Sequence, residues 1–193
     1  MLAWALENRR KFSPAVVNKG RVGSENRVNL ERRIALTTRD LGPLESMLRQ
    51  RLLGAFEDLN ARIGTSLSNP SLELEFAAHG EGAFFGAHTD IPIGCNRRTL
   101  SDQPGHDRII SAVYYFHGLP KGFSGGALRL YRLGTDISAK GWETENHVDV
   151  EPARDTLIAF PSWAVHEVLK VHCESGRFDD YRFALNCWYC RRL

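Results

Sequence analysis

The sequence predicts a mainly β fold of the sandwich or closed double-sheet type, best fitted by a jelly roll with N-terminal α-helices packed on its major sheet. Two observations predict this fold. Helical periodicity is confined to the first 70 residues, and from Ser71 onward apolar residues alternate with period two. About eight short strands then follow one another without intervening helices, most of them separated by Gly or Pro, which is typical of jelly rolls.

Length and composition fit one ordinary globular domain. The chain has 193 residues, of which 42% are hydrophobic and 25% charged, enough for a single sizeable core. We expect one domain over residues 1–193, with a helical support segment at 1–70 and a jelly-roll core at 71–193. A net charge of +2 argues against an obligatory nucleic-acid partner, and none is expected. We see no membrane span or signal peptide, so we expect no membrane partner and a cytoplasmic location. The oligomeric state stays unknown.

The four cysteines fit reduced thiols better than a disulfide framework. Cys187 and Cys190 have C-x-x-C spacing, but strand positions three apart face opposite ways, and no second pair completes a zinc site. We therefore expect both to be packing residues.

The helical part contains one clear amphipathic pattern. Between Leu44 and Ile63, apolar residues recur at steps of three and four with charged residues between them, which predicts a helix that needs a sheet to lie on. Gly64 is expected to end this helix, and a turn follows at 68–70. Residues 1–11 are expected to form a short helix, and 18–39 to form loop and short strand pieces.

The strands of the jelly-roll part follow from period-two alternation. Gly or Pro punctuates most of the gaps between them. The predicted strands are 72–76, 84–88, 109–116, 127–131, 147–150, 156–160, 167–171 and 183–190.

His88 and Asp90 form the first part of a candidate metal site. Two residues apart on an extended segment, they face the same side of it. If His166 joins from a distant strand, the three form a two-histidine, one-carboxylate set that suits iron(II) and leaves positions open for small molecules. The chain has seven histidines, so this pattern alone is weak, and the alternative is that His88 only forms hydrogen bonds at a strand end.

A collinear series of motifs strengthens the metal interpretation. These are His88-Thr89-Asp90, then 111–116, 125–131, 151–152, 157–162, 166–168, and 181–185 with Trp188. Over about residues 72 to 190 the series resembles the prolyl-hydroxylase-like branch of iron(II), 2-oxoglutarate-dependent dioxygenases. The resemblance implies a double-stranded β-helix (jelly-roll) core, Fe(2+) on His88, Asp90 and His166, 2-oxoglutarate and O2 as cosubstrates, and an arginine near the end that binds 2-oxoglutarate.

Arg182 is the candidate for that arginine. A guanidinium stays charged when buried and matches a carboxylate with two parallel hydrogen bonds. In the family the arginine falls about ten residues after the second histidine, which makes Arg177 the rival here. Arg182 is favoured because it opens the period-two run of the last strand and directly precedes Phe-Ala-Leu.

Two further residues are assigned to the cosubstrate by the resemblance. Tyr115 is a candidate donor to the distal carboxylate of 2-oxoglutarate, the alternative being an ordinary core tyrosine. Leu128 is expected to line the same pocket as an apolar wall. The preceding Gly125-Gly126 indicates tight backbone geometry and not phosphate binding, because no helix follows.

The resemblance implies hydroxylation of an unactivated C–H bond of an amino-acid-like or peptidyl substrate, prolyl among the candidates, with release of succinate and CO2. Asp90 favours hydroxylation over halogenation, since related halogenases carry a small residue there, whereas desaturation and demethylation stay open. Two alternatives of other classes are a non-catalytic jelly-roll binding module and a metal-dependent, cupin-like enzyme that does not use 2-oxoglutarate.

Two regions near the site are less informative. His79 stands where related sequences often have a tyrosine that lines the site, and it is interpreted as a loop residue, with substrate contact as the alternative. Residues 91–107 form a long loop directly after the first two candidate ligands, a usual place for substrate recognition, and contain Arg97 and Arg98.

Overall fold

Residues 1–16, 29–91, 106–132 and 146–192 are described by a computed structural model. The helices are α1 (Leu2–Glu7), α2 (Glu45–Gly54) and α3 (Phe56–Ile63), with short 3-10 turns at Arg9–Lys11, Gly42–Leu44 and Phe178–Asp180. The strands are β1 (Ser13–Pro14), β2 (Arg33–Ile34), β3 (Leu36–Thr38), β4 (Ser71–His79), β5 (Phe84–His88), β6 (His106–Tyr115), β7 (Ser124–Gly125), β8 (Leu128–Tyr131), β9 (His147–Val150), β10 (Leu157–Pro161), β11 (His166–Val168), β12 (Val171–His172) and β13 (Arg182–Arg192).

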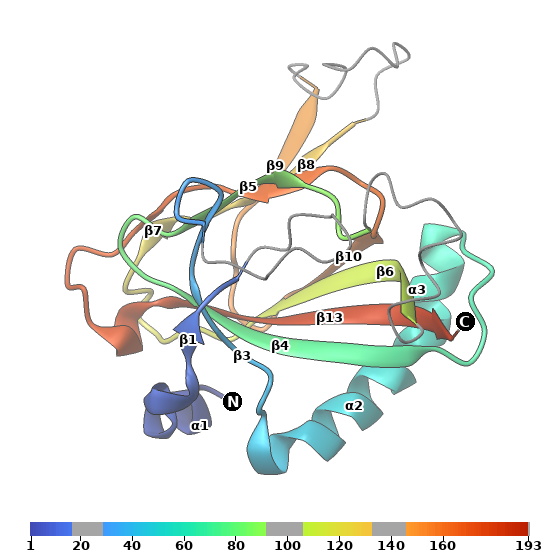
Figure 1. Cartoon of the computed structure of the whole chain (residues 1–193), viewed down its shortest axis with the longest axis horizontal. Helices are drawn as coiled ribbons and strands as arrows, with labels where there is room; N and C mark the ends of the chain where they lie inside the picture. The colour runs from blue at the N-terminus through green and yellow to red at the C-terminus, as the bar shows by residue number, and fades with distance from the viewer. Residues whose placement is uncertain (17–28, 92–105, 133–145, 193) are drawn as a thin grey trace.

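The strands form two main antiparallel sheets. The large sheet has the order β1-β3-β4-β13-β6-β10 and the small sheet the order β2-β5-β11-β8-β9, while β12 pairs with β7. In Figure 1 the small sheet lies above the large one, and α1 and α2 lie on the opposite side of the large sheet. This arrangement confirms the predicted mainly β jelly roll with N-terminal helices packed on the major sheet.

Alternation along the strands gives the large sheet two different faces. Leu72, Leu74 and Phe76 of β4 belong to an apolar core that also contains Leu48 and Phe56 from the helices. The residues between them, starting with Glu73 and Glu75, face the other way, as period two requires. The face toward the small sheet therefore carries the polar side chains from which the candidate site is built.

The predicted helix 44–63 is in fact two helices that meet at Ala55. The Ala55 N–H donates to both Arg51 O and Leu52 O, at 3.2 Å each, so the regular ladder ends there. The carbonyl of Leu52 also accepts a hydrogen bond from the phenol of Tyr189, at 2.8 Å. A side chain of the sheet thus binds the last turn of α2, and Gly64 ends α3 in the left-handed conformation, as predicted.

The strand pattern differs from the predicted one in several places: β4 continues to His79, β6 begins at His106 inside the expected loop 91–107, and β7 was not predicted. The predicted strand 167–171 is divided, because β11 pairs within the small sheet and β12 pairs with β7. In the first 70 residues, β2 and β3 lie in the segment 18–39, where short strand pieces were predicted, whereas β1, which pairs with β3, was not predicted. These strands of two or three residues are too short for a period-two signal.

The described cysteines, Cys173, Cys187 and Cys190, are free and buried. Cys187 lies in the apolar core, whereas Cys190 Sγ lies 3.6 Å from Glu73 Oε1 on the other face of the sheet. Burial raises the pKa of the Cys190 thiol to about 12, which agrees with a packing role. Among the described helices, none combines the length and apolar character needed to cross a membrane.

Candidate metal centre and anion site

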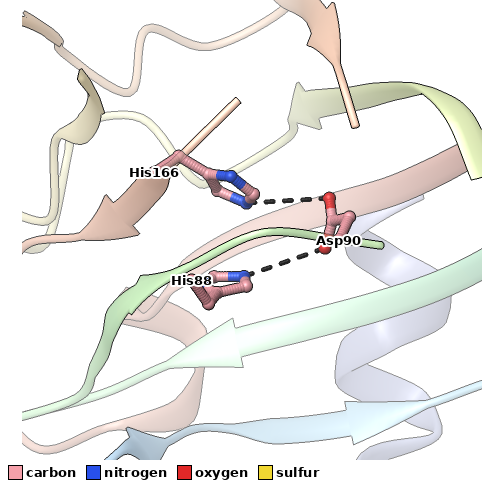
Figure 2. Close-up of side chains that lie close together, drawn as sticks. All are labelled: His88, Asp90 and His166. Atoms are coloured by element: carbon pink, nitrogen blue, oxygen red, sulfur yellow. Dashed lines mark ion pairs between the residues drawn. The ribbon is translucent and has the colours of Figure 1, made fainter. Parts of the chain in front are cut away.

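Strand pairing brings the three candidate metal ligands together. His88 ends β5 and lies opposite His166, the first residue of β11. Asp90 follows β5, and its N–H donates to Ser162 O at 3.0 Å. The ligand atoms of the three residues lie within 4.8 Å of one another. Figure 2 shows both imidazoles directed at the carboxylate, with Nε2 of His88 3.7 Å from Oδ1 and Nε2 of His166 3.6 Å from Oδ2.

Each imidazole is oriented by a backbone carbonyl two residues earlier. Nδ1 of His88 lies 2.9 Å from Gly86 O, and Nδ1 of His166 lies 2.9 Å from Ala164 O. A carbonyl only accepts, so Nδ1 carries a proton, and in the neutral ring the lone pair is then on Nε2. Donation of the second N–H to a fixed acceptor is the usual support of a metal-ligating histidine.

Asp90 is held as an acceptor by neighbouring donors. The Ser111 hydroxyl donates to Oδ2 at 2.6 Å, and the Ser162 hydroxyl, 2.9 Å from that of Ser111, is left to donate to Ser111. Burial works against the Asp90 carboxylate, but the neighbouring His166 and His88 and hydrogen bonds from Ser111 and Trp188 outweigh it, so its pKa stays below the ordinary value.

The protonation state of His88, like that of Asp90, suits metal binding. Burial, and next the neighbouring His166, lower the pKa of His88 to about 3. Near neutral pH, an ionised carboxylate thus faces neutral imidazole nitrogen, which is the state that binds a divalent cation. Two nitrogen donors and one oxygen donor fit iron(II) with open positions.

Arg182 forms a second centre between the sheets. Arg182 is only 1% exposed. Its Nε donates to Gly126 O at 2.7 Å and its Nη2 to the Tyr115 hydroxyl at 3.2 Å, while Nη1 lies 3.4 Å from His79 Nδ1. Burial lowers the pKa of Arg182 from its very high ordinary value. No carboxylate of the described residues forms an ion pair with it.

The structure separates the two candidate arginines. Arg177 has a side chain that is 66% exposed and pairs with Asp179 and Asp180 in a turn. Tyr115 is buried against Arg182, whose guanidinium carbon lies 4.8 Å from the centre of the phenol ring. Arg182 and Tyr115 are thus brought together, and Arg177 is not part of this group.

Leu128 is buried on the small sheet. It is the first residue of β8 and lies opposite Val168, two residues beyond His166. Because residues opposite each other and residues two apart share a face, Leu128 lies on the same face as His166.

The interpretation of His79 as a loop residue is wrong. His79 is the last residue of β4, is 4% exposed, and lies opposite Arg182 in the β4–β13 register. The available signal was the period-two run of Glu73 and Glu75, which continues to His79 on the same face. Arg97 and Arg98, with most of the expected loop 91–107, lie outside the described residues.

Comparisons with known proteins give a family match and one curated relative. Residues 74–190 match the model of the 2OG-Fe(II) oxygenase superfamily. An uncharacterized PKHD-type hydroxylase of Synechocystis sp. is 30% identical over 162 residues, which cover 82% of this chain and 49% of the relative. The chain thus spans about half the length of the curated relative it matches.

Solved structures with the same fold include two bacterial proteins. A Pseudomonas putida prolyl-4-hydroxylase gives a TM-score of 0.62 at 24% identity, over 100% of this chain and 86% of that one. An oxidoreductase of the 2OG-Fe(II) oxygenase family from Burkholderia pseudomallei gives 0.58 at 17% identity, over 94% and 73% of the two chains. At these identities the likeness shows the fold.

Proposed function

Because the chain belongs to the 2OG-Fe(II) oxygenase superfamily, we propose that it is an Fe(2+)- and 2-oxoglutarate-dependent dioxygenase that hydroxylates an unactivated C–H bond. In this proposal His88, Asp90 and His166 hold the iron. Arg182 and Tyr115 bind the distal carboxylate of 2-oxoglutarate, and Leu128 lines the cosubstrate pocket.

The observation that carries this proposal is the buried, carboxylate-free guanidinium of Arg182 on the face that also borders the metal site. Ser111 of β6, which donates to Asp90, and Tyr115, which contacts Arg182, lie an even number of positions apart on one strand. They therefore share a face. An isolated buried cation is unfavourable, and a bound carboxylate would compensate it. A dicarboxylate whose oxo-acid end chelates iron fits both centres.

In this proposal the residues of this chain bind and orient the iron and the 2-oxoglutarate. When bound, iron(II) and 2-oxoglutarate activate O2 and couple its reduction to decarboxylation of the oxo acid, giving succinate, CO2 and an oxidised substrate. In the neutral rings, Nε2 of His88 and of His166 present lone pairs toward the metal position, since each Nδ1 donates to a carbonyl. Ser111 keeps Asp90 oriented, and the buried aromatic Tyr115 helps to exclude water from around Arg182.

The proposed substrate is a small molecule or peptide with an amino-acid-like or peptidyl group, prolyl among the candidates. Support comes from the hydroxylase description of the Synechocystis relative and from the prolyl-4-hydroxylase of similar fold. No nucleic-acid or membrane partner enters the proposal.

The test is a turnover assay with Fe(2+), 2-oxoglutarate and O2, with free amino acids and proline-containing peptides as candidate substrates. We expect succinate in wild-type reactions only when iron and 2-oxoglutarate are both present, and a gain of one oxygen atom by mass spectrometry on the accepted substrate. Arg182→Ala should abolish succinate formation at low 2-oxoglutarate concentration.

Two results would contradict the proposal, one for each alternative function. A folded, iron-loaded wild type that forms no succinate under any of these conditions would favour the binding module. Turnover that needs iron but neither 2-oxoglutarate nor Arg182 would favour the cupin-like enzyme.

A further inference from the structure

His79 is a buried polar residue to which the proposed function gives no role. It ends β4 at the position opposite Arg182 in the β4–β13 register, and its Nδ1 lies 3.4 Å from Nη1 of Arg182. The following residue, Gly80, has the ring of Tyr181 against it, so that an added Cβ would lie 2.3 Å from that ring. The backbone after His79 is thus packed tightly, and the imidazole has a fixed place beside the guanidinium.

The direction of this hydrogen bond fixes the state of the imidazole. A guanidinium only donates, so Nδ1 of His79 must accept, and it can do so only in the neutral ring. Burial, and next the charges of Arg182 on β13 and Arg33 on β2, hold the pKa of His79 well below its ordinary value. His79 therefore stays a neutral acceptor.

A neutral acceptor is well suited to this position. A carboxylate at residue 79 would pair with Arg182 and compete with an incoming anion, whereas an apolar side chain would leave an N–H of Nη1 without a partner. The imidazole orients the guanidinium without forming an ion pair with it.

The donor count shows what remains for a ligand. Of the five N–H groups of a guanidinium, those directed to Gly126 O, to the Tyr115 hydroxyl and to His79 Nδ1 are used. One N–H is left on each terminal nitrogen, and two such donors match the two oxygens of a carboxylate.

We infer that His79 is a positioning residue for the anionic cosubstrate: by accepting from Nη1 it sets the Arg182 guanidinium so that the two remaining N–H groups meet the distal carboxylate of 2-oxoglutarate. This inference rests on the proposed function.

The test compares His79→Leu with His79→Asn, which have nearly the same shape. Asn places an acceptor near the position of Nδ1, and Leu removes it. The dissociation constants of Fe(2+) and of 2-oxoglutarate are measured anaerobically, the latter from the visible charge-transfer band of the iron chelate. His172→Leu, at an exposed site on β12, is the control.

We expect His79→Leu to weaken 2-oxoglutarate binding by about tenfold or more, His79→Asn to restore most of it, and iron affinity to stay at the wild-type value in both. Wild-type 2-oxoglutarate affinity in His79→Leu, or equal losses in the Leu and Asn variants, would overturn the inference. Parallel loss of iron and 2-oxoglutarate affinity would overturn it as well, since that indicates a merely structural role. Absence of the band in wild type would contradict the proposed function itself, and this inference with it.

Discussion

At the scale of single residues, the candidate metal ligands depend on hydrogen bonds from groups that do not touch the metal. Ser111 is the clearest case, because its hydroxyl donates to Asp90 Oδ2 at 2.6 Å in a buried setting. We expect Ser111→Ala to weaken Fe(2+) binding by about tenfold or more, measured by anaerobic titration. Ser162→Ala removes a hydroxyl that contacts Ser111 but not Asp90, so its effect should be smaller. Unchanged iron affinity in Ser111→Ala would contradict this role.

The sequence predicted which residues gather at the candidate site better than it predicted how they are held. The two-residue spacing of His88 and Asp90 is enough to place both on one side of an extended segment. The carbonyls that orient the imidazoles depend on local backbone geometry, and the contact between Arg182 and His79 depends on a register that joins residues 103 apart. Such pairings are set by tertiary packing, which period-two alternation does not encode.

At the scale of elements, a glycine before β8 keeps the space that Arg182 fills. Gly126 has a φ of +70°, and a Cβ there would lie 2.7 Å from Arg182 Cδ and 2.8 Å from Val171 Cγ2. We expect Gly126→Ala to displace Arg182 and weaken 2-oxoglutarate binding by about tenfold or more, with iron binding retained. Gly176→Ala is the matched control, since Gly176 has a φ of +59° and nothing within 4 Å. Equal behaviour of the two variants in 2-oxoglutarate binding would rule out the displacement.

The helices stabilise the large sheet from its apolar side. Phe56 of α3 is buried and stacks on Tyr189 of β13, with ring centres 5.6 Å apart. We expect Phe56→Ala to lower the free energy of unfolding by about 3 to 5 kcal/mol, measured by urea denaturation. Leu53→Ala, at an exposed position of α2, should lower it far less. A small effect at Phe56 would mean that the helices contribute little to the core.

The helices and strands also differ in how well sequence patterns predict them. The apolar spacing from Leu44 to Ile63 continues through Ala55, so it predicts one helix. The structure has two helices there: the regular helical hydrogen bonds are interrupted at Ala55, and the phenol of Tyr189 on β13 binds the last turn of α2. Long strands such as β4 and β13 were recognised because alternation accumulates over many residues. The short edge strands gain their conformation from the neighbouring strand and carry no such pattern.

At the scale of the whole molecule, buried neutral histidines make stability depend on pH. The pKa of His88 is lowered to about 3, and that of His79 well below its ordinary value. Below about pH 6.5 these two histidines therefore bind protons in the unfolded chain, whereas in the folded chain they stay neutral until the pH is much lower. Stability is then fully present above that pH and is lost as the pH falls toward the folded-state pKa values, by about 1.4 kcal/mol per pH unit for each proton.

Urea denaturation of the metal-free protein between pH 7 and 5 measures this dependence. His79→Leu removes one of these protons and should flatten the slope of unfolding free energy against pH. Phe56→Ala, which lowers stability without removing a titrating group, should keep the wild-type slope. A wild-type slope in His79→Leu would show that His79 does not stay neutral in the fold.

We propose that one fold brings a two-histidine, one-carboxylate metal centre and a buried anion site to the same space between two sheets. The most direct measurement is anaerobic titration of the metal-free protein with Fe(2+) and then 2-oxoglutarate, followed by the charge-transfer band of the chelate. We expect a band in wild type that disappears in His88→Ala and needs much higher 2-oxoglutarate concentrations in Arg182→Ala. A folded wild type without the band, or a band that is unchanged in both variants, would contradict it.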